Sequence, residues 1–333
     1  MRQIPRSAGR QFGVFTVKQA LASGWDLGAL KYWTSAGGLV RLRRGAYALA
    51  ASDLSGHELD RLRLIQQSIA AVLLIPAATI SHGSAVALYD LPLLEIPARP
   101  CITLEPPRQT RPAALHVHRQ HIPAHHMDTI AGFRTTSVAR SCIDLAREQG
   151  LVAGVAAADA AIYRGLCSAA DLEAVYSESC RGRAGLANGR KLLKSLDGNT
   201  PSALESVSRL ALEGLVKPQR QVLILSPQGQ FIAHAAFYWE WLGLVGEVED
   251  KIDYTARELR QKQIRHEALA DHGLVTECWG WDVALRPEIL RTRVQQAIHQ
   301  AAEVRAQGLR VTAVVRPERR VSANFSFSGR TRR

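Results

Sequence analysis

Three acidic residues and one lysine in the C-terminal third have the types and spacing of a metal-dependent site that cleaves phosphodiesters. They are Glu205, Glu247, Glu249 and Lys251. Converging carboxylates hold one or two divalent ions such as Mg²⁺, and the ions bind a scissile phosphate and activate water. Such a site also needs an acid on the preceding strand, where residues 232–237 offer Ala236 and no carboxylate. The set lacks its central ligand, and metal-dependent DNA cleavage remains the alternative interpretation.

A second group of residues suits contact with nucleic acid. A helix over residues 27–36 would place on one face Gly28, Lys31, Tyr32 and Ser35. Gly28 lets the helix approach a groove, and Lys31 can neutralise phosphate. The hydroxyl groups of Tyr32 and Ser35 can donate hydrogen bonds to the DNA backbone or to base edges. The opposite face, which we expect to be buried, carries Leu27, Leu30, Trp33 and Thr34.

Three arginines follow this helix in a segment of alternating character. Residues 40–49 alternate apolar and basic side chains around an Arg-Gly turn, which predicts a β-hairpin. We expect Arg41 and Arg43 to point away from the core and, together with Arg44, to hold the flanking DNA backbone. The hairpin is then a wing that carries cations.

The elements that present these residues read as a winged helix-turn-helix. Thr16 and Gln19 have the spacing of a capping box, Gly24 ends the first helix, and Asp26 can cap the second. Helix, turn, helix and basic hairpin each supply one part of docking into a DNA groove. Similar small modules also serve as protein-interaction domains, so an interaction scaffold stays open as a further class of function.

Histidines and cysteines give no clear metal site. Five histidines lie within eleven residues, at His116, His118, His121, His125 and His126. On a strand His116 and His118 would share a face, as metal ligands do, but no carboxylate or cysteine is suitably spaced beside them. The five cysteines are scattered without a C-x-x-C pair, so we expect buried thiols and neither disulfides nor zinc. A histidine- and arginine-rich loop that contacts nucleic acid is the other interpretation.

Composition sets the class of protein. The chain has 333 residues, 47% of them hydrophobic, and a formal charge of +12, which favours polyanionic partners. Residues 1–50 contribute eight cations against Asp26 alone. The longest apolar run, residues 69–80, contains Pro76 and is shorter than the roughly 20 residues of a membrane span. With no signal-peptide core at the N-terminus, we expect a cytoplasmic protein without a membrane partner.

The element order predicts an α+β multidomain fold. A mixed, largely helical middle domain over 51–198 follows the winged helix of residues 1–50, with helices at 58–75, 137–147, 151–164 and 169–176 and strands at 101–104 and 114–118. Residues 199–308 read as helix, three strands, helix, strand, the order of the α/β PD-(D/E)XK nuclease core. Its strands are expected at 221–225, 231–239, 244–251 and 275–279. A basic tail occupies 309–333.

Three sets of motifs carry a resemblance to a known family. The segments Gly13-x-Phe15-Thr16-x-x-Gln19-Ala20 and Leu39-x-Arg41-Leu42-Arg43-Arg44-Gly45-x-Tyr47 resemble the winged helix of AbiEi-type antitoxins of type IV toxin-antitoxin systems. Ser81-His82-x-Ser84-Ala85 and residues 135–147 resemble the middle region of actinobacterial members. Leu204-Glu205-Ser206, Ala236-Phe237-x-Trp239 and Glu247-Val248-Glu249-Asp250 are similar to a C-terminal domain related to very-short-patch-repair endonucleases. The resemblance covers residues 10–305.

The resemblance implies a DNA-binding transcriptional repressor that controls its own operon. Its partners would be double-stranded DNA and, through operon linkage, a nucleotidyltransferase-like toxin. Relatives have Asp before the Phe where this chain has Ala236, and Asp-Gly where it has Glu249-Asp250. A methyl group cannot replace a bridging carboxylate, so we expect a nuclease fold without activity and without a cofactor.

Overall fold

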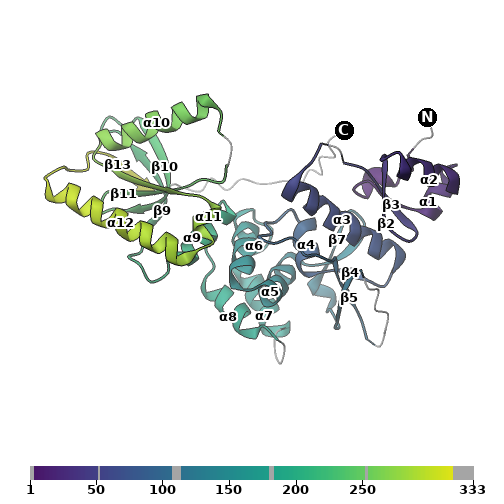
Figure 1. The fold of residues 1–333 in the computed structure, drawn as a ribbon. Helices are drawn as coiled ribbons and strands as arrows, with labels where there is room; N and C mark the ends of the chain where they lie inside the picture. The colour runs from purple at the N-terminus through teal and green to yellow at the C-terminus, as the bar shows by residue number, and fades with distance from the viewer. Residues whose placement is uncertain (1–3, 52, 107–113, 180–183, 252–253, 318–333) are drawn as a thin grey trace. The chain divides into compact units, whose positions relative to one another are not determined.

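The computed structural model describes residues 4–51, 53–106, 114–179, 184–251 and 254–317. Its contacts divide the chain into two compact units, the first ending at Leu196 and the second beginning at Asp197 (Figure 1). The domain boundaries that we predict, at residues 50, 198 and 308, stay predictions. Most of the predicted basic tail, residues 318–333, lies outside the described residues, as does Cys180.

The first unit begins with two short helices against a three-stranded antiparallel sheet of order β1-β3-β2. The elements are η1 (Ala8–Arg10), β1 (Val14–Thr16), α1 (Val17–Ala22), α2 (Leu27–Ser35), β2 (Leu39–Arg43) and β3 (Ala46–Leu49). Phe15, Trp25, Leu30 and Leu39 form its core. This order of helix, helix and hairpin is consistent with the predicted winged helix, which stays a prediction.

Side-chain caps fix both helices where the sequence predicts them. The Thr16 hydroxyl accepts from the Gln19 amide at 3.2 Å, and the Gln19 side chain accepts from the Thr16 amide at 2.8 Å. The Asp26 carboxylate accepts from the Ala29 amide at 2.6 Å. These bonds satisfy helix-start amides that have no partner within the helix, so the starts of α1 and α2 are well defined.

Helix α3 (Gly56–Leu74) packs against both the winged-helix sheet and the elements that follow it. On one side the Gln66 side chain donates to the Phe12 carbonyl at 3.0 Å. On the other, the Arg61 guanidinium donates to the carbonyls of Ala87 and Leu91, each at 2.9 Å. No helix within the described ranges is both long and apolar enough to cross a membrane.

A mixed five-stranded sheet of order β6-β5-β4-β8-β7 forms the rest of the first unit. Its strands are β4 (Thr79–Ile80), β5 (Cys101–Leu104), β6 (His116–Arg119), β7 (Met127–Ile130) and β8 (Phe133–Thr136). Its helices are α4 (His82–Leu88), η2 (Ala124–His126), α5 (Val138–Gln149), α6 (Leu151–Tyr163), α7 (Ala169–Ser179) and α8 (Leu186–Lys194). The predicted helices and the strands β5 and β6 are confirmed, whereas α8, β4, β7 and β8 were not predicted.

The second unit has the element order that the sequence predicts. Its elements are α9 (Ala203–Ala211), β9 (Gln219–Leu225), β10 (Phe231–Trp239), β11 (Leu244–Val248), α10 (Ala256–Asp271), β12 (Val275–Trp279), α11 (Trp281–Ala284), α12 (Pro287–Ala306) and β13 (Val314–Pro317). Strands β9, β10 and β11 are antiparallel, and β12 is parallel to β11. Helix α10 covers one face of the sheet, and α9 and α12 cover the other (Figure 1).

Three boundaries in this unit differ from the prediction. Strand β9 begins at Gln219, two residues earlier than predicted. Strand β11 ends at Val248, so Glu249 and Lys251 follow the strand instead of lying on it. Residues 314–317, which we predicted as part of the tail, pair with β9 as an edge strand. Val315 packs on the core cluster that contains Val222 and Ile224, and this burial explains why the segment joins the sheet.

Candidate nucleic-acid interface

The predicted contact face of α2 is open to solvent. Gly28, Lys31, Tyr32 and Ser35 are all exposed. The Tyr32 side chain is 65% exposed, with its ring edge-on to that of Trp33 at 6.0 Å between centroids. Capping by Asp26 holds the start of the helix, so this face is presented on a defined element. Its placement agrees with the prediction, and its role in binding DNA stays a prediction.

The buried face of α2 is narrower than predicted. Leu30 is buried, but Leu27 and Trp33 are 64% and 38% exposed. Trp33 lies over the turn before β2, where its ring would come within 2.8 Å of a Cβ at Gly38. The turn therefore needs a glycine, and Trp33 covers the turn instead of entering the core. The expectation that Leu27 and Trp33 share the buried face is wrong.

A β-bulge separates the arginines of the wing. Arg41 pairs with Tyr47 and Arg43 pairs with Ala46. Between these two pairs β2 therefore has one residue more than β3. Tyr47 and Ala46 point to opposite faces of the sheet, and so do their partners. Arg43 is partly buried, and its burial lowers the pKa of its guanidinium. The expectation that Arg41 and Arg43 point the same way is therefore wrong.

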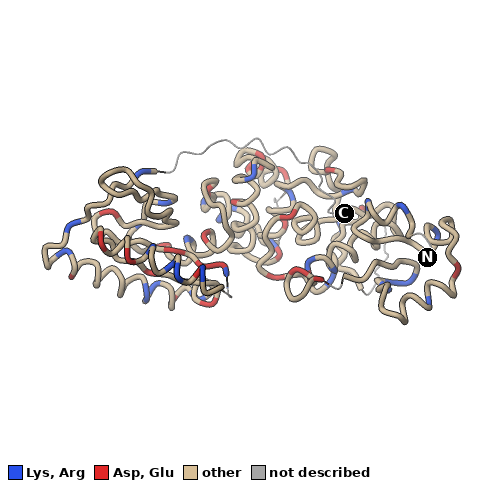
Figure 2. Tube along the Cα trace, turned by 90° about the horizontal axis from the view of Figure 1, so that it is seen from above, with Lys and Arg blue, Asp and Glu red and all other residues tan. Residues whose placement is uncertain are grey.

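Arg41 and Arg44 remain the exposed cations of the hairpin. Gly45, at φ 91°, closes the turn in a conformation that favours glycine. Figure 2 shows that Lys and Arg positions outnumber Asp and Glu positions around the N-terminal elements. Because Asp26 is the one acidic residue among positions 4–50, little nearby charge offsets these cations.

The carboxylates of the second unit do not converge. Among the described residues, Glu205, Glu247 and Glu249 do not form a group whose ligand oxygens all lie within 4.8 Å of one another. Each has its own partner instead. Glu249 pairs with Lys262, and Lys251 pairs with Glu258 at 2.6 Å. A divalent ion would have to displace these partners to gather the predicted ligands.

Glu205 is buried at the start of α9. It accepts a hydrogen bond from the Gln221 side chain, and Arg220 Nη2 lies 3.9 Å from its carboxylate. Burial is the larger effect and raises the pKa of Glu205 to about 7, against the opposing attraction of Arg220. An ion that binds here would have to displace the Gln221 bond and the proton that burial favours.

Glu247 lies near the end of β11, against two basic residues of α10. Its Oε2 lies 2.9 Å from Arg265 Nη2 and 3.2 Å from His266 Nε2. In the antiparallel register, Phe237 pairs with Gly246, so the next position along β10, Ala236, lies beside Glu247. The place where a second acid would face Glu247 is taken by a buried methyl group.

The histidine-rich segment divides between separate places in the first unit. His116 and His118 lie on β6 close to Cys101 and Glu148, whereas His125 and His126 lie close to Glu178. His121 pairs with Glu105 at 3.1 Å. The expectation that no cysteine or carboxylate stands beside His116 and His118 is wrong, because strand pairing and helix packing bring both from distant parts of the chain.

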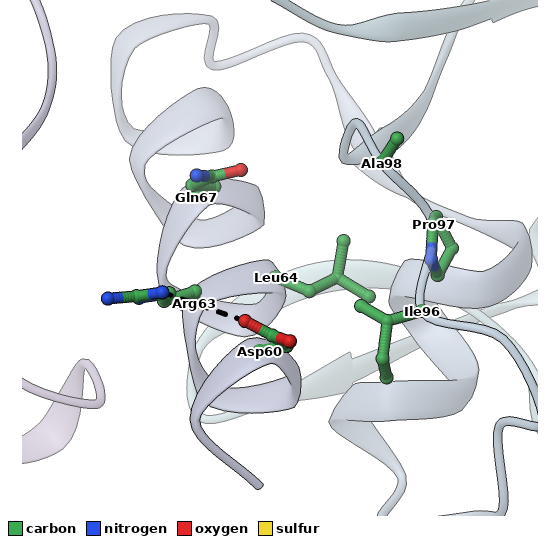
Figure 3. Close-up of a pocket in the computed structure, with 7 residues that line it drawn as sticks. All are labelled: Asp60, Arg63, Leu64, Gln67, Ile96, Pro97 and Ala98. Atoms are coloured by element: carbon green, nitrogen blue, oxygen red, sulfur yellow. Dashed lines mark ion pairs between the residues drawn. The ribbon is translucent and has the colours of Figure 1, made fainter. Parts of the chain in front are cut away.

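A separate pocket lies between α3 and the segment 96–98 (Figure 3). On its wall, Arg63 Nη1 lies 3.6 Å from Asp60 Oδ1, so the two side chains form an ion pair. Leu64, Ile96 and Pro97 supply much of the remaining lining. The pocket contains none of the predicted site residues.

Comparisons with known proteins give two kinds of match. A family model matches the N-terminal elements, and individual proteins match most of the chain. Residues 2–50 match the family described as "Transcriptional regulator, AbiEi antitoxin". Two curated proteins of Mycobacterium tuberculosis, the uncharacterized proteins MT2308 and Rv2248, are each 30% identical over 215 residues, which are 64% of this chain and 74% of theirs. The crystal structure of the RV2827C protein from the same organism aligns at a TM-score of 0.36 and 19% identity, over 66% of this chain and 85% of that one.

Proposed function

We propose that this chain, which belongs to the same family as the uncharacterized protein Rv2248 of Mycobacterium tuberculosis, is a DNA-binding transcriptional regulator of the AbiEi antitoxin type. The observation that carries the proposal is the exposed α2 face beside the cationic wing. Both lie within residues 2–50, which match the antitoxin regulator family. As a regulator of its own operon it would act in the cytoplasm, with a nucleotidyltransferase-like toxin as its partner.

Docking follows from how α2 and the hairpin are exposed. Helix α2 enters the major groove with Lys31 and Tyr32 toward the bases, while Gly28 and Ser35 allow close approach. Arg41 and Arg44 reach the phosphates beside the groove, and Arg43 contributes less because it is partly buried. Phosphate contacts set affinity and base contacts set sequence preference, so the two groups of residues can be tested separately.

The wing is tested by the salt dependence of binding. In Arg41→Ala/Arg44→Ala we expect weaker binding to every duplex, and each lost phosphate contact lowers the slope of log K against log salt by roughly 0.9. Lys191→Ala/Lys194→Ala is the matched control, which removes two exposed cations from α8 of the same unit. Fluorescence anisotropy across a salt series measures both quantities. An unchanged slope in the double variant removes the wing from the interface.

The α2 face is tested by sequence preference. Replacing Lys31 and Tyr32 by Ala should reduce binding to DNA from the protein's own promoter more than binding to random duplex of equal length. The ratio of the two affinities is the measurement, with Lys191→Ala/Lys194→Ala again as control. Equal losses on both DNAs would contradict a base-reading role for this face.

For the second unit we propose a nuclease-like fold that does not cleave DNA. Two observations support it: the methyl group of Ala236 lies beside Glu247, and Glu205 and Glu247 are engaged by Gln221 and Arg265. The alternative is a metal-dependent DNA endonuclease, guided by the winged helix, with Glu205, Glu247 and Glu249 as ligands and Lys251 beside the attacking water. Cleavage assays on the whole protein distinguish the two.

A further inference from the structure

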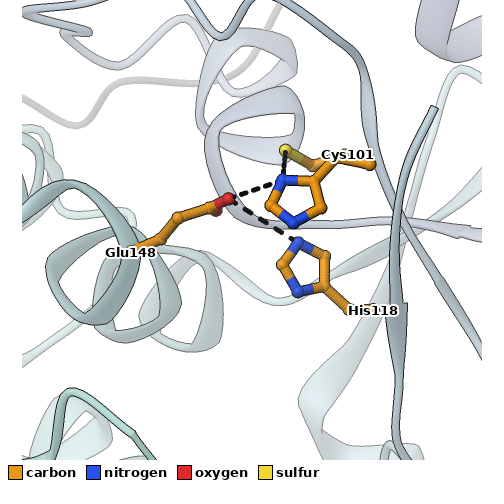
Figure 4. A group of neighbouring side chains, drawn as sticks. Cys101, His118 and Glu148 are labelled. Atoms are coloured by element: carbon orange, nitrogen blue, oxygen red, sulfur yellow. Dashed lines mark hydrogen bonds and ion pairs between the residues drawn. The ribbon is translucent and has the colours of Figure 1, made fainter. Parts of the chain in front are cut away.

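Four side chains of metal-binding type meet at one edge of the five-stranded sheet. Cys101 lies on β5, His116 and His118 on β6, and Glu148 near the end of α5. Strands β5 and β6 are parallel, with Cys101 directly paired with His116. His116 and His118 are two apart on a strand, so both face the same side. Figure 4 shows Cys101, His118 and Glu148 pointing toward one another.

The ligand atoms have spacings close to those of a tetrahedral site. His116 Nδ1 lies 2.8 Å from Glu148 Oε1 and 3.9 Å from Cys101 Sγ, and His118 Nε2 lies 3.9 Å from the same glutamate oxygen. One ligand atom from each of the four residues lies within 4.8 Å of all the others. Around a tetrahedral zinc ion, ligand atoms lie roughly 3.3–3.7 Å apart, and the three distances above fall within about half an ångström of that range.

One nitrogen of the cluster lacks a hydrogen-bond partner among the described residues. His118 Nε2 is buried and, within the described part of the chain, has no hydrogen-bond partner. A buried polar atom without a partner is unfavourable, and a metal bond would satisfy it. The His118 ring is also held in place, because it stacks on His82 at 3.5 Å between centroids and 10° between planes.

We propose that Cys101, His116, His118 and Glu148 form a binding site for a zinc ion. One sulfur, two imidazole nitrogens and one carboxylate oxygen are ligands that Zn²⁺ prefers, and Mg²⁺ and Ca²⁺ do not take such a set. Four protein ligands leave no open position, so the site is structural. His116 and Glu148 are exposed, which gives the ion a path from solvent.

Two other groups in the described residues fit an ion less well. Glu247, His266 and Cys278 lie together, but Glu247 is already paired with Arg265. His125, His126 and Glu178 offer three ligands without a sulfur. The four-residue cluster is the one with both a full tetrahedral set and a thiol.

The bound ion would attach an edge strand to a helix. Strand β6 has a sheet partner on one side only, in the order β6-β5-β4-β8-β7. Through the ion, β6 would be tied to β5 and to the end of α5. Zinc should therefore raise the thermal midpoint of the protein, because an ion that binds the folded state alone stabilises it.

The test uses the full-length protein, stripped of metal and then titrated with Zn²⁺ or Co²⁺. We expect one tight equivalent by calorimetry, a tetrahedral Co²⁺ spectrum with a thiolate charge-transfer band, and a higher thermal midpoint with zinc. Cys101→Ser should abolish the thiolate band. Cys101→Ser and Glu148→Gln should each weaken affinity by at least ~10–100-fold, the loss typical of perturbing a zinc site. Glu148→Gln should keep the thiolate band.

Control variants decide where the ion binds. Cys278→Ser and His125→Ala should leave stoichiometry, affinity and spectrum unchanged, and circular dichroism without metal checks that each variant folds. If Cys101→Ser fails to fold, Glu148→Gln carries the test alone. The proposal is overturned if the wild type binds well below one equivalent. It is also overturned if the thiolate band is lost in Cys278→Ser and kept in Cys101→Ser.

Discussion

For single side chains, the nearest partners distinguish two buried glutamates of the second unit. Glu205 and Glu247 are both buried, yet Glu247 faces the positive Arg265 whereas Glu205 mainly meets neutral Gln221 and a more distant Arg220. Burial without a close cation raises the pKa of Glu205 to about 7. Two glutamates that look alike in the sequence thus have different partners in the fold.

The raised pKa of Glu205 makes a pH-dependent prediction. Between its ordinary pKa of 4.5 and about 7, the folded state keeps a proton that the unfolded state releases, so rising pH favours unfolding. Glu205→Gln removes this penalty. Relative to wild type, the variant should gain up to about 3 kcal/mol in free energy of unfolding as pH rises across this range.

Urea unfolding of both proteins at about pH 5 and about pH 8 measures that gain. Glu258→Gln is a control in the same unit, because the pKa of Glu258 is lowered by its bonds to Lys251 and Thr255. A difference between wild type and Glu205→Gln that stays constant with pH would show that Glu205 is ionised in the folded protein.

Single residues also mark where the sequence stops being informative. Cys101, His116 and Glu148 are far apart in the chain, and only the pairing of β5 with β6 and the packing of α5 bring them together. Spacing along the chain cannot reveal such a group. Ala131, at φ 51°, likewise stands in the β7–β8 turn in a conformation more usual for Gly or Asn, so this hairpin keeps Gly132 but lacks the Asn-Gly or Asp-Gly pair that signals such a turn.

Among the secondary-structure elements, α2 agrees well with what the sequence predicts. Its cap, length and exposed polar face follow from local pattern, because caps and helical spacing act within a few residues. The bulge in β2 does not follow from local pattern. Alternation predicts Arg41 and Arg43 on one face, whereas the pairing with β3 puts them on opposite faces.

The cap of α2 gives a prediction for this element. Asp26→Ala removes the bond to the Ala29 amide and should cost about 1 kcal/mol of stability, with weaker DNA binding because the start of the helix frays. Asp26→Asn keeps a capping oxygen and removes one negative charge beside the proposed DNA face. It should bind DNA at least as tightly as wild type.

Chemical unfolding and anisotropy titrations on the same preparations compare the two variants. The result that counts against a role for α2 is equal DNA affinity for wild type and Asp26→Ala under conditions where both are folded.

For the whole molecule, the order of elements was predictable and the sheets were predictable in part. Local periodicity predicted the two N-terminal helices with their hairpin and the helix–strand order of the second unit. It missed β4, β7, β8 and β13, which are two to four residues long. Such strands form because a neighbouring strand offers free backbone groups, and a sequence window does not contain that neighbour.

The whole protein should not nick plasmid DNA with Mg²⁺ or Mn²⁺, because the predicted carboxylates are apart and Ala236 replaces the central one. Ala236→Asp should gain some metal-dependent cleavage if the second unit is a nuclease fold that lost this acid. Ala235→Asp is the matched control, since it buries a carboxylate on the opposite face of β10.

Gel assays of supercoiled plasmid read out both expectations. Nicking by the wild type that disappears in Glu247→Ala would replace the inactive interpretation with the endonuclease alternative. Inertness of both Asp variants, each shown to fold, would count against a nuclease ancestry for this unit.

The attachments of helix α3 limit which sequence changes the first unit can accept in evolution. Arg61 attaches one part of it to the middle elements, and Gln66 attaches the next part to Phe12, in the turn before β1. One residue inserted between Arg61 and Gln66 would rotate these two attachments by about 100° and separate them by about 1.5 Å. The number of residues between Arg61 and Gln66 thus sets how the N-terminal elements are rotated about the α3 axis relative to the middle elements. Substitutions in this stretch should therefore be tolerated far better than insertions or deletions.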